Sequence, residues 1–362
     1  MSSFPMKSAD LIDFRDTIIA WFEKHKRDLP WRHTDDPYSI WISEVMLQQT
    51  QVKTVLSYYE RFLESFPTIT DLSDADLEFV LKRWEGMGYY ARARNLHKAS
   101  GIISDKFNGR IPQDATSFRA LPGAGEYITA AVLSRAFNKP LAVVDGNVRR
   151  VLARLFMIGD PMNSSKANHS FSAHATALLD QQRPGQFNEA MMELGATVCT
   201  PQRPDCLNCP INTFCKSFAE KKQMDFPKIA EKKRTPLLDL VVSLIYKEDH
   251  FLIVRRPLDG LLGGLWELPG GQIEKNEHTA DACTRRIKES MGFDIDVHEK
   301  IMQIHHAYSH FRVRIDVFRS IYKDGDIILK DHIDYRWIRL FEVGNFAFHI
   351  AHHKIFRKLN DG

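Results

Sequence analysis

Four of the five cysteines of this 362-residue chain fall within 17 residues: Cys199, Cys206, Cys209 and Cys215. Their spacing is C-x6-C-x2-C-x5-C, and three prolines in the same stretch indicate an irregular loop. Four thiolates in one loop can close a tetrahedral zinc site or hold an iron–sulfur cluster, and the spacing alone leaves both open. In a reducing compartment such clustering favours a metal site over disulfides.

Two acidic residues have neighbours that make a chemical role conceivable. Glu44 lies in the run Trp41–Gln51, where the polar residues Gln48 and Gln49 follow one turn later in an expected apolar helix. Asp145 stands directly before another expected helix, where the ordinary role of an aspartate is to cap the helix N-terminus. Taken alone, each residue is explained as well by a surface position or by a cap.

The segment Leu121–Gly125, with the sequence LPGAG, separates two helical stretches. Gly123 and Gly125 allow a tight turn and a close approach of a ligand to the backbone. The N–H groups of such a turn, next to a helix N-terminus, can bind a phosphate. The pattern fits the hairpin of helix-hairpin-helix DNA-binding proteins, and a plain corner between two helices is the alternative.

A Nudix-like pattern occurs near the C-terminus, where Gly271, Glu277, Arg285, Glu289 and Gly292 have the spacing G-x5-E-x7-R-E-U-x-E-E-x-G. Arg286 and Ser290 occupy two positions where the pattern has glutamates. That box needs clustered carboxylates to hold divalent cations beside a pyrophosphate, and an arginine among them repels metal. We therefore expect the fold to persist without hydrolase activity.

The elements that position these residues change in character along the chain. Residues 8–220 show apolar stripes at helical spacing, one of them formed by Trp41, Val45, Val52, Val55 and Tyr59. Residues 221–236 are charged, contain two prolines and have the composition of a linker. Beyond them, strand patterns at 237–246, 251–254 and 311–317 accompany a helical stretch at 279–290. The sequence predicts a multidomain protein: an all-α domain (1–220, with the cysteine loop at 199–215), a linker (221–236) and a smaller α+β domain (237–362).

The composition, 44% hydrophobic and 26% charged, excludes a disordered chain, a collagen and a simple coiled coil. The longest strongly apolar run, Leu240–Tyr246, is far shorter than the roughly 20 residues of a membrane span. Acidic residues precede any apolar stretch at the N-terminus, so a secretory signal is not expected. We expect a soluble intracellular protein. The net charge of +3 is a weak hint of a polyanionic partner, and the basic residues of 82–110 form the one local cluster.

Several of these motifs, taken in order, resemble the adenine DNA glycosylases of the MutY type. The similarity is carried by LPWR (29–32), ISEVMLQQTQV (42–52), GMGYYAR (86–92), LPGAG, VVDGNVRRVLAR (143–154), NEAMMELGATVC (188–199) and the cysteine spacing. It covers nearly the whole chain. The resemblance implies a helix-hairpin-helix glycosylase domain with a [4Fe–4S] cluster on the four cysteines, followed by a Nudix-like domain that recognises 8-oxoguanine.

The resemblance also implies roles for individual residues. The catalytic residues would be Glu44 as general acid, Asp145 as the anion that stabilises an oxocarbenium-like sugar, and Tyr127 and Asn147 as positioning groups. The adenine pocket would include Arg27, Trp31, Arg32, Leu47 and Glu189. DNA contacts would come from Gln49, Tyr89, Gly123 and Gly125, with Gln49 and Tyr89 entering the duplex. Recognition of 8-oxoguanine would fall to Tyr308, Ser309 and His310.

Two departures from related patterns refine the expectation. Glycosylases of this superfamily that also cut the strand carry a lysine two residues after the last hairpin glycine, and this chain has Tyr127 there. A tyrosine cannot form a Schiff base, so a monofunctional enzyme is expected. Tyr308 stands where the lesion-reading loop usually has phenylalanine, so its hydroxyl needs a partner or solvent.

The expected function is hydrolysis of the N-glycosidic bond of adenine opposite 8-oxoguanine or guanine in duplex DNA, as a step of base excision repair. We expect a monomer in the cytoplasm, associated with the nucleoid if the source is bacterial, and with no membrane partner. Three rival interpretations are an endonuclease III-like glycosylase/lyase, a catalytically dead lesion binder and a Nudix hydrolase with a DNA tether. The first is disfavoured by Tyr127, and the second by the intact pair Glu44 and Asp145. The third is disfavoured by the altered box at Arg286 and Ser290.

Overall fold

The computed structural model describes residues 6–231, 235–308 and 311–360. The chain forms two compact units. The first comprises Met1–Leu63, Thr68–Thr70 and Ala99–Lys232, and the second comprises Glu64–Pro67, Asp71–Lys98 and Lys233–Gly362. The two units differ from the domains expected at 1–220 and 237–362, because residues 71–98 pack in the second unit. The expected domain bounds stay a prediction.

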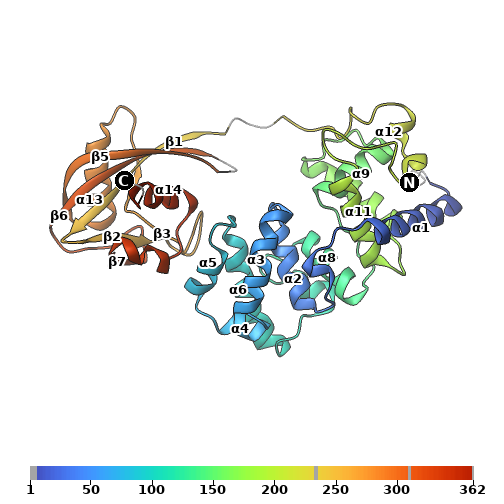
Figure 1. Ribbon diagram of the computed structural model, residues 1–362, viewed down its shortest axis with the longest axis horizontal. Coiled ribbons are helices and arrows are strands. Elements are labelled where there is room, and N and C mark those ends of the chain that lie inside the picture. The colour runs from blue at the N-terminus through green and yellow to red at the C-terminus, as the bar shows by residue number, and fades with distance from the viewer. Residues whose placement is uncertain (1–5, 232–234, 309–310, 361–362) are drawn as a thin grey trace. The chain divides into compact units, whose positions relative to one another are not determined.

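Helices build the first unit (Figure 1). They are α1 (Ser8–His25), α2 (Pro37–Leu47), α3 (Val52–Ser65), α7 (Ala115–Arg119), α8 (Glu126–Phe137), α9 (Gly146–Phe156), α10 (Asn168–Leu178), α11 (Pro184–Thr197) and α12 (Lys216–Ala219). Short 3-10 turns lie at Pro30–Arg32, Ser165–Ala167 and Asn212–Phe214. The last two residues of α3 belong to the second unit. Three further helices, α4 (Ile69–Asp74), α5 (Leu77–Trp84) and α6 (Ala91–Phe107), belong to it wholly or partly.

The apolar stripe that runs from Trp41 to Tyr59 belongs to two helices, which corrects the expectation of one continuous helical pattern. α2 ends at Leu47, and α3 begins at Val52. Between them Gln49 has a φ of 56°, a left-handed conformation that a non-glycine residue adopts rarely. The side chains of Gln48 and Gln49 therefore belong to a turn and not to the helix that carries Glu44.

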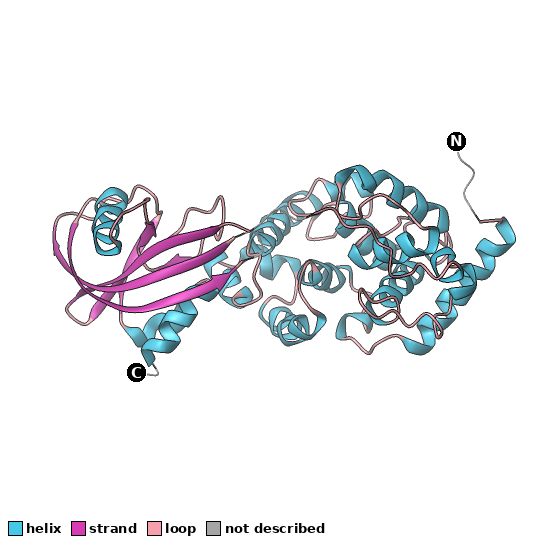
Figure 2. Ribbon diagram, turned by 90° about the horizontal axis from the view of Figure 1, so that it is seen from above, coloured by secondary structure: helices cyan, strands magenta, loops and turns pink. Residues whose placement is uncertain are grey.

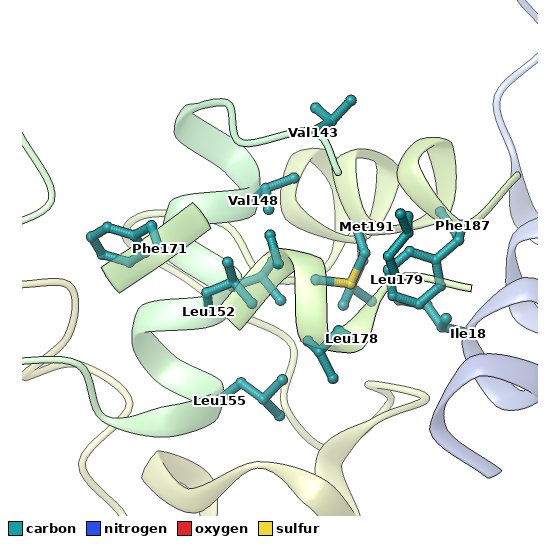
Figure 3. Close-up of a cluster of buried hydrophobic side chains, with 14 of the residues drawn as sticks. Ile18, Val143, Val148, Leu152, Leu155, Phe171, Leu178, Leu179, Phe187 and Met191 are labelled. Atoms are coloured by element: carbon teal, nitrogen blue, oxygen red, sulfur yellow. The ribbon is translucent and has the colours of Figure 1, made fainter. Parts of the chain in front are cut away.

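The core of the first unit lies where α1, α9, α10 and α11 meet (Figure 3). Val148, Leu152 and Leu155 recur at helical spacing along α9 and are almost fully buried. Phe171 from α10 and Met191 from α11 join the same cluster. This packing fixes α9, whose first residue follows Asp145, against the helix that carries Glu189.

The second unit contains a seven-stranded sheet (Figure 2). Its strands are β1 (Leu237–Lys247), β2 (His250–Arg255), β3 (Trp266–Glu267), β4 (Gly270–Gln272), β5 (Asp294–Ala307), β6 (Arg312–Asp324) and β7 (Asp334–Ile338). The main order is β3-β2-β1-β6-β5, β4 pairs with β1, and β7 pairs with β2. Only the β1–β6 pair is parallel among the paired strands described.

The two faces of the sheet are covered by different helices. Val241 and Ile245 of β1 pack with α13 (Thr279–Met291), whereas their neighbours Val242 and Leu244 pack on the side of α14 (Ile350–Asn360). This alternation is the period of two that a strand imposes on its side chains. The observed β1, β2, β6 and α13 confirm the strands and the helix that were expected in this part of the chain.

Residues 71–98 pack with the sheet inside the second unit. Trp266 donates its indole N–H to Glu78 (2.6 Å), and the backbone N–H of Phe348 donates to Glu85 (2.8 Å). Arg94 donates to the carbonyl oxygens of Gly260 and Gly263 (3.2 and 2.8 Å). Arg94, one of the basic residues of the cluster at 82–110, therefore acts in internal packing.

No helix among the described residues has both the length and the apolar character to cross a membrane.

Candidate active site

Glu44 lies on α2 and is largely shielded from solvent. Desolvation by burial raises the pKa of its carboxyl group from 4.5 to about 7. The negative charges of Glu189 and Asp145 act in the same direction. A carboxyl group with this pKa holds a proton near neutral pH and can still give it up, which is the requirement for a general acid.

The hydroxyl of Tyr127, on the first turn of α8, donates a hydrogen bond to Oε2 of Glu44 (2.7 Å). Burial and the neighbouring carboxylates of Glu44 and Asp145 raise the pKa of Tyr127 well above 10, so the phenol stays a donor. The same hydrogen bond favours the ionised form of Glu44 and limits the rise of its pKa. Tyr127, next to the hairpin, thus orients the carboxyl group of Glu44.

Asp145 caps the N-terminus of α9, as its position before the helix indicated. Its Oδ1 accepts the backbone N–H of Val148 (2.7 Å), and its Oδ2 accepts the side-chain amide of Asn147 (3.0 Å). Burial raises the pKa of the Asp145 carboxyl group, and these hydrogen bonds oppose the rise. Desolvation is thus the largest influence on the pKa of Asp145, and the N–H groups at the start of α9 only partly offset it.

A small cavity of about 10 Å³ lies beside Glu44. Its lining includes Trp31, which was expected in an adenine pocket, and Glu189 from α11. The guanidinium Nε of Arg32 lies 3.5 Å from Oε1 of Glu189. The structure thus places Trp31 and Glu189 at the cavity beside Glu44, and Arg32 adjoins Glu189.

The other two expected pocket residues lie elsewhere. Arg27 donates to both oxygens of Glu193 (2.7 and 2.8 Å), and Glu193 also accepts from Arg32 (2.9 Å). Leu47 is the last residue of α2 and is not among the described residues that line the cavity. Burial opposes ionisation of Glu193, yet the two arginines lower the pKa of its carboxyl group to about 2.

Three of the four expected DNA-contacting residues have a positive φ. Gly123 has a φ of 79° in the hairpin between α7 and α8, and Gly125 caps α8 with open space in front of its Cα. Gln49 and Tyr89, expected to enter the duplex, both have positive φ, at 56° and 48°. Non-glycine residues in this conformation are held there by surrounding structure and cluster at ligand-binding sites.

The four expected metal-binding cysteines line one cavity of about 30 Å³, together with Arg154 of α9. Among the residues that the structure describes, no three His, Cys, Asp or Glu side chains are grouped closely enough to hold a single metal ion. The four thiols thus line one space, and four cysteine thiols are a donor set that fits an iron–sulfur cluster.

Two arginines join the cysteine loop to the helix that follows Asp145. Arg150 donates to the carbonyl oxygens of Cys199 and Gly195 (2.8 and 2.7 Å) and to the side chain of Asn147 (2.8 Å). Arg154 donates to Sγ of Cys199 (3.2 Å). Asn147 in turn holds Asp145, so a continuous chain of hydrogen bonds leads from the cysteine loop to this carboxylate.

The Nudix-like box has its carboxylates occupied by arginines. Arg285 binds Glu277 through Nε (2.6 Å), and Arg286 donates to Glu289 (3.0 Å) and Asp331 (3.2 Å). The side chain of Arg286 also lies against Gly271, where a Cβ would come within 2.1 Å of its Nε. A guanidinium group therefore fills the region where this box needs cations.

Tyr308, from the expected lesion-reading segment, has the partner that its hydroxyl requires. Its oxygen lies 2.9 Å from Nδ1 of His349, and its ring stacks on Phe311 with centroids 4.8 Å apart. Burial raises the pKa of the Tyr308 hydroxyl above its ordinary value. Ser309 and His310, expected to read the lesion with it, lie outside the described residues.

Two residues of the site were missed from the sequence. Arg135 of α8 pairs with Glu189 (2.5 Å), and Glu193 holds Arg27 and Arg32. A charged residue in the otherwise apolar stretch 130–137 was a signal for Arg135. Glu189 and Glu193 are four residues apart, so they share one face of α11, which was a signal for Glu193.

Comparisons with known proteins identify the two parts of the chain by family. Residues 42–173 match the family model of the HhH-GPD superfamily base excision DNA repair proteins, and residues 240–358 match the NUDIX domain model. A solved thermostable thymine-DNA glycosylase is 29% identical, with a TM-score of 0.54 over 59% of this chain and 98% of that one. An endonuclease III–DNA complex, 24% identical with a TM-score of 0.51, covers 60% and 98% and shows the fold alone.

The fold and the buried carboxyl groups thus define a helix-hairpin-helix base excision DNA glycosylase with a C-terminal Nudix-like domain. Curated relatives narrow the class. The adenine DNA glycosylase of Rattus norvegicus is 33% identical over 96% of this chain and 78% of its own length, and that of Homo sapiens is 32% identical over 96% and 74%. The chain belongs to the adenine DNA glycosylase family.

Proposed function

We propose that the enzyme removes adenine paired with 8-oxoguanine, or with guanine, from duplex DNA and leaves the strand intact. The observation that carries this proposal is the buried Glu44 carboxyl, whose pKa is raised to about 7, in hydrogen-bond contact with Tyr127. The cavity beside Glu44 is too small for a base in this structure, so the pocket has to open when the base enters. The adenine is flipped out of the stack to reach it.

In the proposed reaction, Glu44 donates its proton to N7 of adenine, which otherwise is a poor leaving group. The glycosidic electron pair moves to the base, and the sugar becomes oxocarbenium-like. Asp145, oriented by the N–H of Val148 and by Asn147, stabilises this cation electrostatically. Water then adds to C1′ and gives one proton to the Glu44 carboxylate, which restores the acid. Tyr127 keeps the Glu44 carboxyl oriented and has no amine with which to attack the sugar.

The cysteine loop is proposed to bind a [4Fe–4S] cluster through Cys199, Cys206, Cys209 and Cys215. When bound, the cluster supplies a rigid, charged support for this loop. The hydrogen bonds of Arg150 and Arg154 to the loop are the features of this chain that transmit that support to α9. The base removal itself is carried out by protein side chains and water.

The Nudix-like domain is proposed to read 8-oxoguanine and not to hydrolyse nucleotides. Arg286 neutralises Glu289 and Asp331, which leaves no free carboxylate cluster at the described part of the box for a divalent cation. 8-Oxoguanine differs from guanine by an N7–H donor and an oxygen at C8, and hydroxyl or imidazole groups can distinguish them. We assign this role to the segment Tyr308-Ser309-His310, and we propose that the enzyme acts as a cytoplasmic monomer.

The test is a panel of three duplexes incubated with saturating enzyme at one salt concentration, containing A opposite 8-oxoguanine, A opposite guanine, and thymine glycol opposite A. We expect release of adenine from the first two, with strand breaks only after alkali. Release of thymine glycol, or strand cleavage without alkali, would instead establish a glycosylase/lyase of the endonuclease III kind.

A further inference from the structure

An ion pair between two helices forms part of the wall beside Glu44. Nη1 of Arg135, on α8, lies 2.5 Å from Oε2 of Glu189, on α11, and their side chains are only 22% and 15% exposed. Nη2 of Arg135 donates to the carbonyl oxygens of Arg32 and Thr34 (3.3 and 3.2 Å). Arg135 thus ties α11 and the loop after Trp31 to α8.

This pair separates two cavities. Ser134, Arg135, Gly185 and Glu189 line both the small cavity beside Glu44 and a second cavity of about 330 Å³. The second cavity is polar and also contains Arg183, whose guanidinium binds Asp16 (2.6 Å) and Asp180 (2.8 Å) but not Glu189. Glu189 therefore lies at the boundary between the two cavities. Its carboxylate is held mainly by Arg135 at 2.5 Å, whereas Arg32 lies farther away at 3.5 Å.

The direction of the Glu189 carboxylate matters because of the groups on the edge of adenine that faces Glu44. N7 and the 6-amino group lie side by side on one edge of the base, so a base that offers N7 to Glu44 offers N–H donors to the acceptor next to it. Glu189 lines the same cavity as Glu44 and is a carboxylate. A base with an oxygen at C6, such as hypoxanthine, would instead meet Glu189 with an acceptor, and the two would repel each other.

We propose that Arg135 is a positioning residue: it holds the Glu189 carboxylate where it accepts a hydrogen bond from the 6-amino group of the flipped adenine. In this proposal Arg135 acts through Glu189 and is assigned no contact of its own with the base or the sugar. This inference rests on the proposed excision of adenine and adds a residue that determines which base is accepted. Glu189 raises the pKa of Glu44, and the positive charge of Arg135 opposes that rise.

The experiment measures single-turnover release of three bases, adenine, unsubstituted purine and hypoxanthine, each placed opposite 8-oxoguanine. Arg135→Leu should lower the rate for adenine roughly 10- to 100-fold, the range for loss of a hydrogen bond to a charged group. The rate for purine, which has no 6-amino group, should fall by less than about threefold, since that hydrogen bond is absent from the start. Arg135→Lys, which retains the charge, should recover part of the adenine rate.

Arg183→Leu is the matched control, because it removes an arginine and its ion pairs from the same polar cavity without touching Glu189. It should leave the ratio of adenine to purine rates unchanged. In a Glu189→Gln background, Arg135→Leu should have little further effect. Thermal unfolding and iron content of each variant show whether it is folded, and Arg135→Lys keeps the test decisive if the leucine variant does not fold.

Equal losses for adenine and purine in folded Arg135→Leu or Arg135→Lys would overturn the inference, as would additive effects of the Arg135 and Glu189 changes. Failure of the proposed function looks different, because the unmodified enzyme would then release no adenine from either mispair.

Discussion

Replacing Tyr127 by phenylalanine tests how the Tyr127 hydroxyl affects the pKa of Glu44. The change removes the 2.7 Å hydrogen bond to Oε2 of Glu44 and leaves a ring of almost the same shape. That bond favours the ionised carboxylate, so its loss should raise the pKa of Glu44 above the value of about 7. The acidic form of Glu44 is the active one, and activity falls as pH rises through this pKa.

The magnitude follows from the worth of such a bond. A hydrogen bond to a charged group contributes roughly 1.5–3 kcal/mol, and one pKa unit corresponds to about 1.36 kcal/mol. The alkaline limb of the pH–rate profile should therefore move upward by about 1 to 2 pH units in Tyr127→Phe. The absolute rate at the optimum falls as well if Tyr127 also positions the sugar, but the position of the limb does not depend on that loss.

The assay is single-turnover adenine release from a duplex with A opposite 8-oxoguanine, measured from pH 5 to 10 with saturating enzyme. Tyr59→Phe is the matched control, because the Tyr59 hydroxyl bonds to the carbonyl of Ser39 (3.3 Å) and not to Glu44. The alkaline limb of the Tyr59→Phe profile should lie at the same pH as that of the unmodified enzyme. An unmoved limb in Tyr127→Phe, or one displaced to lower pH, would refute the reasoning that Glu44 is the titrating acid.

Three further outcomes follow from the site. Glu44→Gln and Asp145→Asn should bind the mispair with base removal reduced by at least about 10²-fold, the low end for loss of a general acid, and more than a tenth of the activity left in either would contradict its role. Tyr127→Lys should gain strand cleavage that borohydride traps, whereas trapping of the unmodified enzyme would reveal another amine nucleophile. Arg150→Gln should bind iron at a stoichiometry near four per chain, as measured by iron analysis, yet lose activity by at least about tenfold because Asn147 loses its anchor; unchanged activity would show that this link is not needed.

The titration of Glu44 also makes a prediction about stability. The folded-state pKa of about 7 lies above the unfolded value of 4.5, so folding is favoured below pH 4.5 and this contribution is lost as pH rises through 7. Glu44→Gln should therefore be more stable than the unmodified protein at pH 8, by at most about 3 kcal/mol, and by much less at pH 5. Chemical denaturation at the two pH values measures this, and an equal difference at both would mean that Glu44 is not buried as described.

Local patterns predicted the elements well, whereas the roles of Glu44 and Asp145 came from the family resemblance and stay a prediction. The alternation along 311–317 marked β6, the period of 279–290 marked α13, and the cysteine spacing marked the loop on α9. The break between α2 and α3 was not predicted, because an apolar stripe records which residues are buried and not the left-handed turn at Gln49. The Arg135–Glu189 pair joins residues 54 apart in sequence, and periodicity within one helix carries no information on such a pair.

The assignment of residues 71–98 to the second unit also changes how a deletion is to be interpreted. The indole of Trp266 and the backbone of Phe348 are the partners of Glu78 and Glu85, so a protein that stops at residue 236 would leave two carboxylates of α5 and the loop after it without these hydrogen bonds. Glu85 keeps its ion pair with Lys82 (2.6 Å), and each lost hydrogen bond to a carboxylate costs roughly 1.5–3 kcal/mol. Such a truncated enzyme would carry a damaged Gly86–Tyr90 loop as well as a missing lesion reader. A loss of preference for 8-oxoguanine after truncation thus has two sources, and substitutions that leave α5 covered separate them.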